Sequence, residues 1–226
     1  MEAQHRILPS DVTPRVEILP YILDPRLTSS SRPPPSDIYD SGSNLVFEAG
    51  SPPTKDVYYE KKFPVPGQRD SFNDKINRAA KELGLGEFKF QGSGKARVGA
   101  TWDAHRLISK AGEVEQQGGK SGLQNRFSKR LYADFHINSL DLSDDAVLAK
   151  AAVDLKVFPD EKAALAFLNS DEHDDTLRFK LQQADMNGVQ SVPFYIVNEG
   201  ADHLSETGSH EVFMRMFKMA SAAFIT

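Results

Sequence analysis

Cysteine is absent from this chain of 226 residues. Disulfides, thiolate nucleophiles and sulfur-ligated metal sites all require a cysteine side chain, so this chain can form none of them by itself. The same absence fits a reducing compartment. The N-terminus also lacks a basic start followed by an apolar core of signal-peptide length. We therefore expect a cytoplasmic protein.

Long apolar runs and an excess of positive charge are lacking too. The sequence contains no stretch of about 18 apolar residues, so no membrane span is expected. The net charge of −5 and the isoelectric point near 5.7 disfavour nucleic acid and anionic membranes as partners. A phosphate-binding glycine loop is not predicted either, because QGSGKA at 91–96 lacks the strand and helix that flank such loops.

The residues that are present predict strands at both ends and helices between them. VEILPYIL at 16–23 and FYIV at 194–197 are rich in β-branched and aromatic side chains, which favours strands, and FKF at 88–90 indicates a short edge strand. Capping residues and apolar spacing predict helices over 70–84, 101–111, 123–135, 144–155, 159–168, 171–186 and 209–224. Residues 28–56 are rich in serine, proline and glycine, which predicts an inserted loop that is either a surface linker or a lid over a pocket.

Four stretches together resemble the DsbA-like thioredoxin-fold superfamily, especially its FrnE-like and 2-hydroxychromene-2-carboxylate isomerase-like branches. They are LPYILDP at 19–25, TWDAHRLI at 101–108, RLYADFHIN with DLSDDAVL between 130 and 148, and NGVQSVPFYIV at 187–197. The resemblance implies an α/β protein with a thioredoxin-like fold and an inserted α-helical domain. It divides the chain into the N-terminal part of the thioredoxin-like half (1–69), the helical domain (70–187) and the C-terminal part of that half (188–226).

The chain departs from the family pattern at the redox motif. In the family a first strand runs into Cys-Pro-x-Cys at the start of the first helix, whose dipole lowers the pKa of the first thiol. In the isomerase and kappa glutathione-transferase branch a serine takes that place. Residues 1–25 are similar to the end of that helix followed by the second strand. We therefore expect the first strand and the active-site motif to be missing, through loss or through a gene model that starts at the wrong methionine.

The stretch at 187–197 is similar to the loop that lies beside the reactive cysteine in the family. The resemblance implies a cis peptide bond before Pro193 and backbone groups that hold an extended peptide or glutathione. Because the thiol is absent, we expect Ser191, Val192 and Pro193 to line a binding pocket. The alternative is that the bend only shapes the core.

A single predicted helix carries the densest group of polar and aromatic candidates. His105, with an ordinary pKa near 6.5, could act as a general acid or base, and Arg106 could bind a carboxylate. Trp102 is a candidate pocket wall. Tyr21, as a second catalytic candidate, and Tyr132 could place hydroxyls in the cleft between the two halves. Each residue has a structural alternative, namely packing of the helical domain.

We predict no metal site, and no cofactor unless glutathione binds. The run His173-Asp174-Asp175 contains metal-ligating groups, but acidic residues are expected at a helix start. The predicted partner is a small organic molecule. The FrnE-like resemblance implies an isomerase or cyclase in secondary, polyketide-type metabolism. The alternatives are a non-catalytic binding or scaffold homodimer, a glutathione-dependent isomerase or transferase, and a truncated oxidoreductase.

Overall fold

The computed structural model describes residues 16–22, 27, 29–31, 51–89, 96–189, 191–197 and 202–205. Residues 197 and 202–205 are described by their backbone only. The chain divides into two compact units, which are described separately below. The larger unit comprises residues 17–178. The smaller unit comprises 1–16 with 179–226. The predicted domain borders at 69/70 and 187/188 stay predictions. Ile18, Ser30 and Ser31 are hydrogen-bonded within the larger unit, to Gln124, Ser143 and Asp145.

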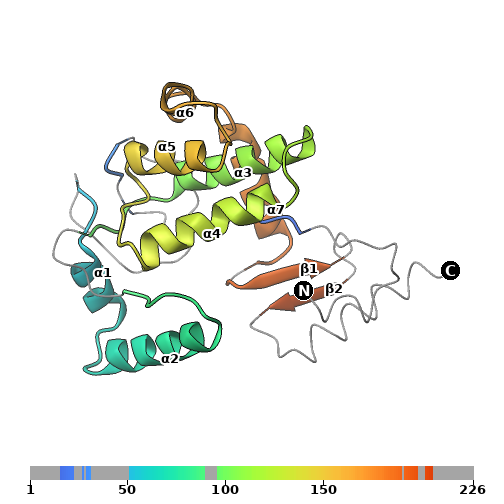
Figure 1. The fold of residues 1–226 in the computed structure, drawn as a ribbon. Helices are drawn as coiled ribbons and strands as arrows, with labels where there is room; N and C mark the ends of the chain where they lie inside the picture. Colours follow the sequence, from blue (N-terminus) through green and yellow to red (C-terminus); the bar gives the residue numbers. More distant parts are fainter. Residues whose placement is uncertain are drawn as a thin grey trace. The chain divides into compact units, whose positions relative to one another are not determined.

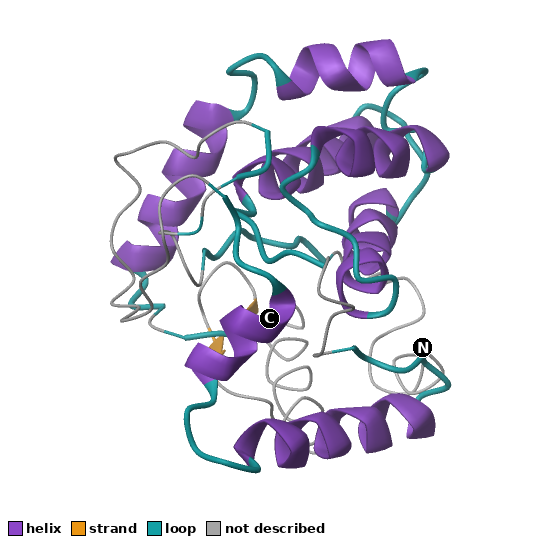
Figure 2. Ribbon diagram, turned by 90° about the vertical axis from the view of Figure 1, so that its left-hand side faces the viewer, coloured by secondary structure: helices purple, strands orange, loops and turns teal. Residues whose placement is uncertain are grey.

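Helices make up most of the described chain (Figures 1 and 2). They are α1 (Lys55–Lys62), α2 (Gln68–Glu82), α3 (Trp102–Gln116), α4 (Leu123–His136), α5 (Asp145–Asp154), α6 (Glu161–Leu168) and α7 (Asp174–Met186). Helix α7 crosses from the larger unit into the smaller one. None of the helices in the described ranges is long and apolar enough to cross a membrane.

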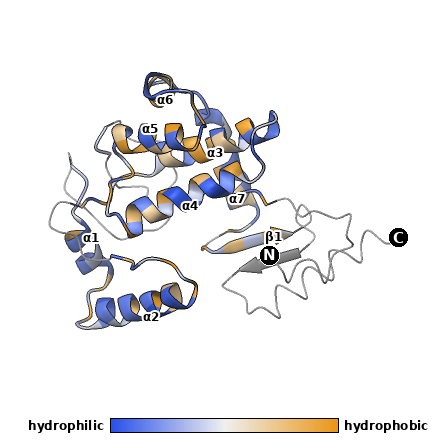
Figure 3. Ribbon diagram, in the orientation of Figure 1, coloured by the Kyte–Doolittle hydropathy of each residue, from blue (hydrophilic) through white to orange (hydrophobic). Residues whose placement is uncertain are grey.

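The main core of the larger unit lies among α3, α4, α5 and α6. Helix α3 packs against α4, and α5 packs against both α4 and α6. Leu107, Phe127 and Leu148 are fully buried there. Each such side chain contributes roughly 1.5–3 kcal/mol through apolar burial. Figure 3 shows the corresponding alternation of apolar and polar residues along these helices.

A second apolar cluster surrounds α1. It contains Leu27, Tyr58, Tyr59 and Val98. Thr54 caps α1 by accepting a hydrogen bond from the Val57 amide at 3.3 Å. This helix was not predicted, and its first two residues fall within the predicted loop at 28–56.

Side-chain amides replace strand partners at two places where strands were predicted. The amide group of Gln124 accepts from Ile18 N at 2.9 Å and donates to Ile18 O at 3.2 Å. Asn77 does the same for Phe88, accepting from its N–H at 2.7 Å and donating to its carbonyl at 3.1 Å. The strand predictions are therefore wrong over 16–22 and 88–89, because these extended segments bond to side chains of helices rather than to a neighbouring strand.

Most predicted helices are confirmed, with shifted ends. Helix α3 continues five residues beyond its predicted end at 111, into a stretch that was predicted to be a loop. Asp144, not Ser143, caps α5 by accepting from Ala146 N. The Ser143 hydroxyl instead accepts from Ser30 N at 2.9 Å. The predicted helix at 209–224 and most of the 28–56 insertion lie outside the described residues.

The smaller unit contains the sheet of the described chain. Strand β1 (Phe194–Val197), as predicted, pairs antiparallel with β2 (Asp202–Ser205), which the sequence analysis did not anticipate. The register sets Phe194 opposite Ser205 and Val197 opposite Asp202. The peptide bond between Val192 and Pro193, just before β1, is cis.

Candidate functional site

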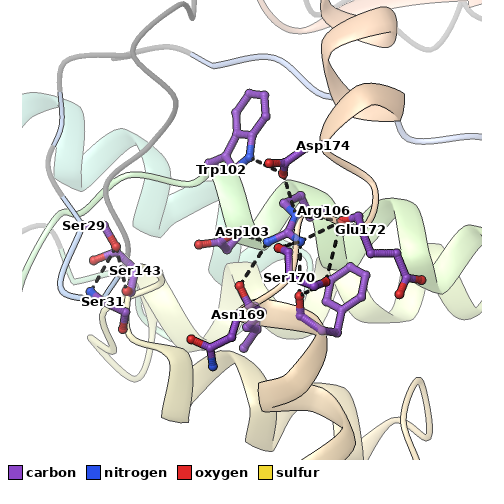
Figure 4. Close-up of polar contacts among 12 residues, drawn as sticks. Ser29, Ser31, Trp102, Asp103, Arg106, Ser143, Asn169, Ser170, Glu172 and Asp174 are labelled. Atoms are coloured by element: carbon purple, nitrogen blue, oxygen red, sulfur yellow. Dashed lines mark hydrogen bonds and ion pairs between the residues drawn. The ribbon is translucent and has the colours of Figure 1, made fainter.

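Arg106 is the most contacted of the predicted site residues. Its side chain is fully buried on α3, within ion-pair distance of Asp103 at 2.6 Å and Asp174 at 2.9 Å. Its N–H groups also donate to backbone carbonyls at the end of α6 and beyond, those of Phe167, Leu168, Ser170 and Glu172 (Figure 4). The last carbonyls of a helix have no partner within the helix. Arg106 therefore closes α6 and holds the chain that leads into α7.

Trp102 belongs to the same cluster. Its indole Nε1 donates to Oδ1 of Asp174 at 2.9 Å, and the side chain is buried (Figure 4). The Arg178 guanidinium lies 5.6 Å from the centre of the indole ring. The first turns of α3 and α7 are thereby joined through one carboxylate oxygen, since Arg106 also contacts Oδ1 of Asp174. These contacts give Trp102 a structural position; its role as a pocket wall stays a prediction.

His105 and Tyr21 are brought together by the backbone. The imidazole of His105 hydrogen-bonds to the backbone of Tyr21, and burial lowers the pKa of His105 to about 4 despite that bond. A histidine with this pKa is neutral at physiological pH and is a weak proton acceptor. Its predicted role as a general base near neutral pH therefore has little support from its surroundings, although it can still donate or accept a hydrogen bond.

The described ring contact of Tyr132 is with His136 and not with the residues above. It is 65% exposed on α4, and its ring stacks on that of His136 at 6.2 Å between centroids. Tyr132 shares no described contact with Trp102 or Arg106. Its hydroxyl is available to solvent, so it is the predicted binding residue of the larger unit that a ligand can reach directly.

The predicted loop residues of the smaller unit are all exposed. Ser191, Val192 and Pro193 precede β1, and Val192 leaves 48% of its surface in solvent. Tyr195 on the following strand is 38% exposed. An apolar side chain next to exposed backbone groups is suited to holding an extended or planar ligand.

Comparisons with known proteins identify the family and the fold of this chain. The family model for the DSBA-like thioredoxin domain matches residues 44–220, which is most of the chain. The chain belongs to the DsbA-like thioredoxin family. The crystal structure of a putative protein disulfide isomerase from Nitrosomonas europaea shares the fold, with a TM-score of 0.51 and 16% identity over 76% of this chain and 88% of that one. No curated protein matches.

Membership of the DsbA-like family confirms the predicted thioredoxin-like fold with a helical insertion. The chain nevertheless has none of the thiols that give the family its redox chemistry, because it contains no cysteine.

Two basic side chains with lowered pKa values, the buried Lys55 and the half-buried His136, were not predicted as candidates. Lys55 is fully buried, and burial together with Lys89 lowers its pKa to about 8. Its ammonium donates to the carbonyls of Lys89 and Phe135, near the end of α4. Burial, with Lys55 nearby, also lowers the pKa of His136 to about 4. Sequence spacing gave no signal for either, because the carbonyls and rings involved come from separate segments.

Three ligating groups meet between α3 and the start of α7. Ligand atoms of Glu113, Glu172 and His173 lie within 4.8 Å of one another. The ammonium of Lys110 already contacts both carboxylates, Glu113 at 3.0 Å and Glu172 at 2.8 Å. A metal ion would have to displace this internal cation, so we assign no metal to these residues. Only His173 of the run 173–175 belongs to the group.

Proposed function

We propose that this DsbA-like protein performs no thiol–disulfide exchange and binds a small organic molecule at loop 191–193. The observation that carries the proposal is the exposure of Ser191, Val192 and Pro193 immediately before β1. Backbone groups at the end of such a loop can hydrogen-bond an extended ligand. Val192 and Tyr195 add apolar surface beside them. Since the chain contains no cysteine, binding at this loop has no thiol to serve.

Hydrogen–deuterium exchange tests where the molecule binds. We expect amides at 189–197 to exchange more slowly in protein isolated from its own source than in the same protein after unfolding, dialysis and refolding. Ligand contacts protect backbone amides that are otherwise open to water. Equal exchange at 189–197 in both samples, with a ligand demonstrably removed, would place the ligand elsewhere.

The proposed reaction is isomerisation or cyclisation of the bound molecule. Orientation and removal of water can supply several kcal/mol of rate acceleration without a covalent nucleophile. The catalytic candidate predicted in the larger unit, His105, is kept as a neutral imidazole by its burial. The retained molecule itself gives the test, because isomerisation keeps its mass and changes its chromatographic retention. Conversion at the same rate by a His105→Ala variant with unchanged melting would remove His105 from the mechanism.

Glutathione as a bound thiol is the competing explanation for the loop. It predicts saturable binding of glutathione that is lost when Val192, at the loop, is replaced by aspartate. Isothermal titration with glutathione separates the two. Binding would favour a glutathione-dependent enzyme, and its absence would favour a ligand that brings no thiol.

A further inference from the structure

A serine, a histidine and a glutamate form a continuous series of hydrogen bonds in the larger unit, and two of them, Glu113 and His173, belong to the group described above. The Oγ atom of Ser109 lies 3.1 Å from Nδ1 of His173. The Nε2 atom of His173 lies 2.7 Å from Oε2 of Glu113. This is the order of contacts by which a nucleophile, its base and an orienting carboxylate are recognised.

Helix α3 and the residue before α7 place these three side chains. Ser109 and Glu113 are four residues apart on α3, so they share one helix face. His173 comes from the residue before α7 and has a left-handed backbone conformation, with φ of +67°. Non-glycine residues rarely adopt this conformation, and such residues are found disproportionately at functional sites. The imidazole contacts α3 through both of its ring nitrogens.

The hydrogen-bond partners determine the direction of proton transfer. His173 and Lys110, its largest influences, lower the pKa of Glu113, so this carboxylate is ionised and can only accept hydrogen bonds. Because Glu113 can only accept, an imidazole at this place that carries one proton donates it from Nε2 to Glu113. This leaves the lone pair of Nδ1 to accept the hydroxyl proton of Ser109.

Further contacts hold the carboxylate of Glu113 in place. Lys110 contacts its Oε2 atom at 3.0 Å, and Gln117 donates to Oε1 at 2.8 Å. The group is not sealed from solvent. The side chain of His173 is 11% exposed and that of Glu113 is 35% exposed. Ser109 is half-buried on α3 and so retains some exposed surface.

We propose that Ser109 is an activated nucleophile that accepts acyl groups from small esters, with His173 as its general base and Glu113 as the residue that positions the imidazole. Ser109 Oγ bonds to the acyl carbon while its proton moves to His173 Nδ1. The ester C–O bond then breaks, and the leaving alcohol takes that proton. Water next attacks the acyl carbon, gives its proton to Nδ1 and releases the acid, and the same proton returns to Ser109.

A fluorophosphonate probe tests the nucleophile directly, because attack by an activated serine displaces fluoride and leaves a stable adduct. We expect one adduct, located on Ser109 by peptide mass spectrometry. It should be lost in Ser109→Ala and retained in Ser71→Ala, which changes an exposed serine on α2. His173→Gln should slow labelling by about 100-fold or more, since a positioned base typically contributes 10²–10⁴-fold. Glu113→Gln should slow labelling to a smaller extent.

The absence of native cysteine allows a second, independent test. Ser109→Cys and Ser71→Cys each introduce the single thiol of the protein. Beside His173 the first thiol should ionise more readily than an exposed thiol, whose pKa is about 8.5. We expect Ser109→Cys to react with iodoacetamide at pH 7 at least about tenfold faster than Ser71→Cys, and this advantage to vanish when His173→Gln is added.

Two results together would overturn the proposal: labelling of Ser109 no faster than that of Ser71, and a Ser109→Cys thiol no more reactive than Ser71→Cys. Melting curves recorded for every variant show whether it is folded. Even if His173→Gln fails to fold, the comparison of Ser109→Cys with Ser71→Cys still decides the outcome.

Discussion

The Nε atom of Arg106 lies 2.9 Å from Oδ1 of Asp174, and both side chains are withdrawn from most solvent. The same oxygen accepts the indole N–H of Trp102. Helix α3, the end of α6 and the start of α7 therefore meet at one guanidinium. Because its N–H groups donate within the chain, Arg106 fixes the first turn of α7 within the larger unit.

Replacing Arg106 by methionine should destabilise the larger unit strongly. The change leaves the carboxylates of Asp103 and Asp174 without the cation between them, and breaking one side of a buried ion pair typically costs about 3–5 kcal/mol. Urea unfolding followed by circular dichroism measures the loss. Arg126→Met is the matched control, because Arg126 is exposed on α4 and bonds only to nearby carbonyls. A similar, small effect for both variants would contradict the central position of Arg106.

Gln124→Leu should release the segment around Ile18. Both backbone groups of Ile18 lose the partner that takes the place of a strand, and the expected cost is about 1–3 kcal/mol. Hydrogen–deuterium exchange should show faster exchange at 17–22, with little change in α5. Asn125→Leu, at the exposed neighbouring position, is the control. Unchanged protection at Ile18 would show that other contacts hold this segment.

Mild acid should lower the free energy of unfolding at pH values where the carboxylates are still ionised. Burial lowers the pKa of His105 and His136 to about 4, whereas an unfolded histidine titrates near 6.5. Between these values the unfolded chain binds more protons than the folded chain. The free energy of unfolding therefore decreases as the pH falls through this window, by roughly 1–3 kcal/mol per histidine at pH 4.

Unfolding titrations at pH 7, 6 and 5 separate this effect from that of Glu113 and Glu115, whose depressed pKa values matter only below about 4.5. A double variant, His105→Gln with His136→Phe, should flatten the dependence between pH 7 and 5. The phenyl ring keeps the contacts of His136 with Phe88 and Phe135. An equally steep dependence in the double variant would assign the acid sensitivity to other groups.

The sequence predicted the helices of the core better than the extended segments. The four-residue steps of Phe127, Leu131 and Phe135 identify α4 without any tertiary information. The segment at 16–22 has strand-like composition, but its backbone partner is the side chain of Gln124, 106 residues away from Ile18. The local pattern of apolar and polar residues cannot predict a hydrogen bond between a backbone group and a distant side chain. The same holds for Phe88 and Asn77.

For the candidate sites too, the sequence predicted some features and the structure was needed for others. Residue type was enough to select His105 and Arg106, but not to show that one has a pKa of about 4 and the other is surrounded by acceptors. The sequence indicates the hydrogen-bonded group of Ser109, His173 and Glu113 only in part, because a serine and a glutamate four residues apart share a helix face. The histidine that joins them comes from about 60 residues later, so spacing alone could not reveal it.

Native mass spectrometry of the protein purified from its own source tests ligand binding at loop 191–193 most directly. We expect a complex with one small organic molecule, lost or greatly reduced in Val192→Asp. Because Val192 is half-exposed, the substitution should leave melting unchanged. Loss of the ligand from a folded variant would support binding at the loop and would give the mass of the molecule. A ligand-free protein, such as a clean dimer that needs no small molecule, would contradict the proposed function.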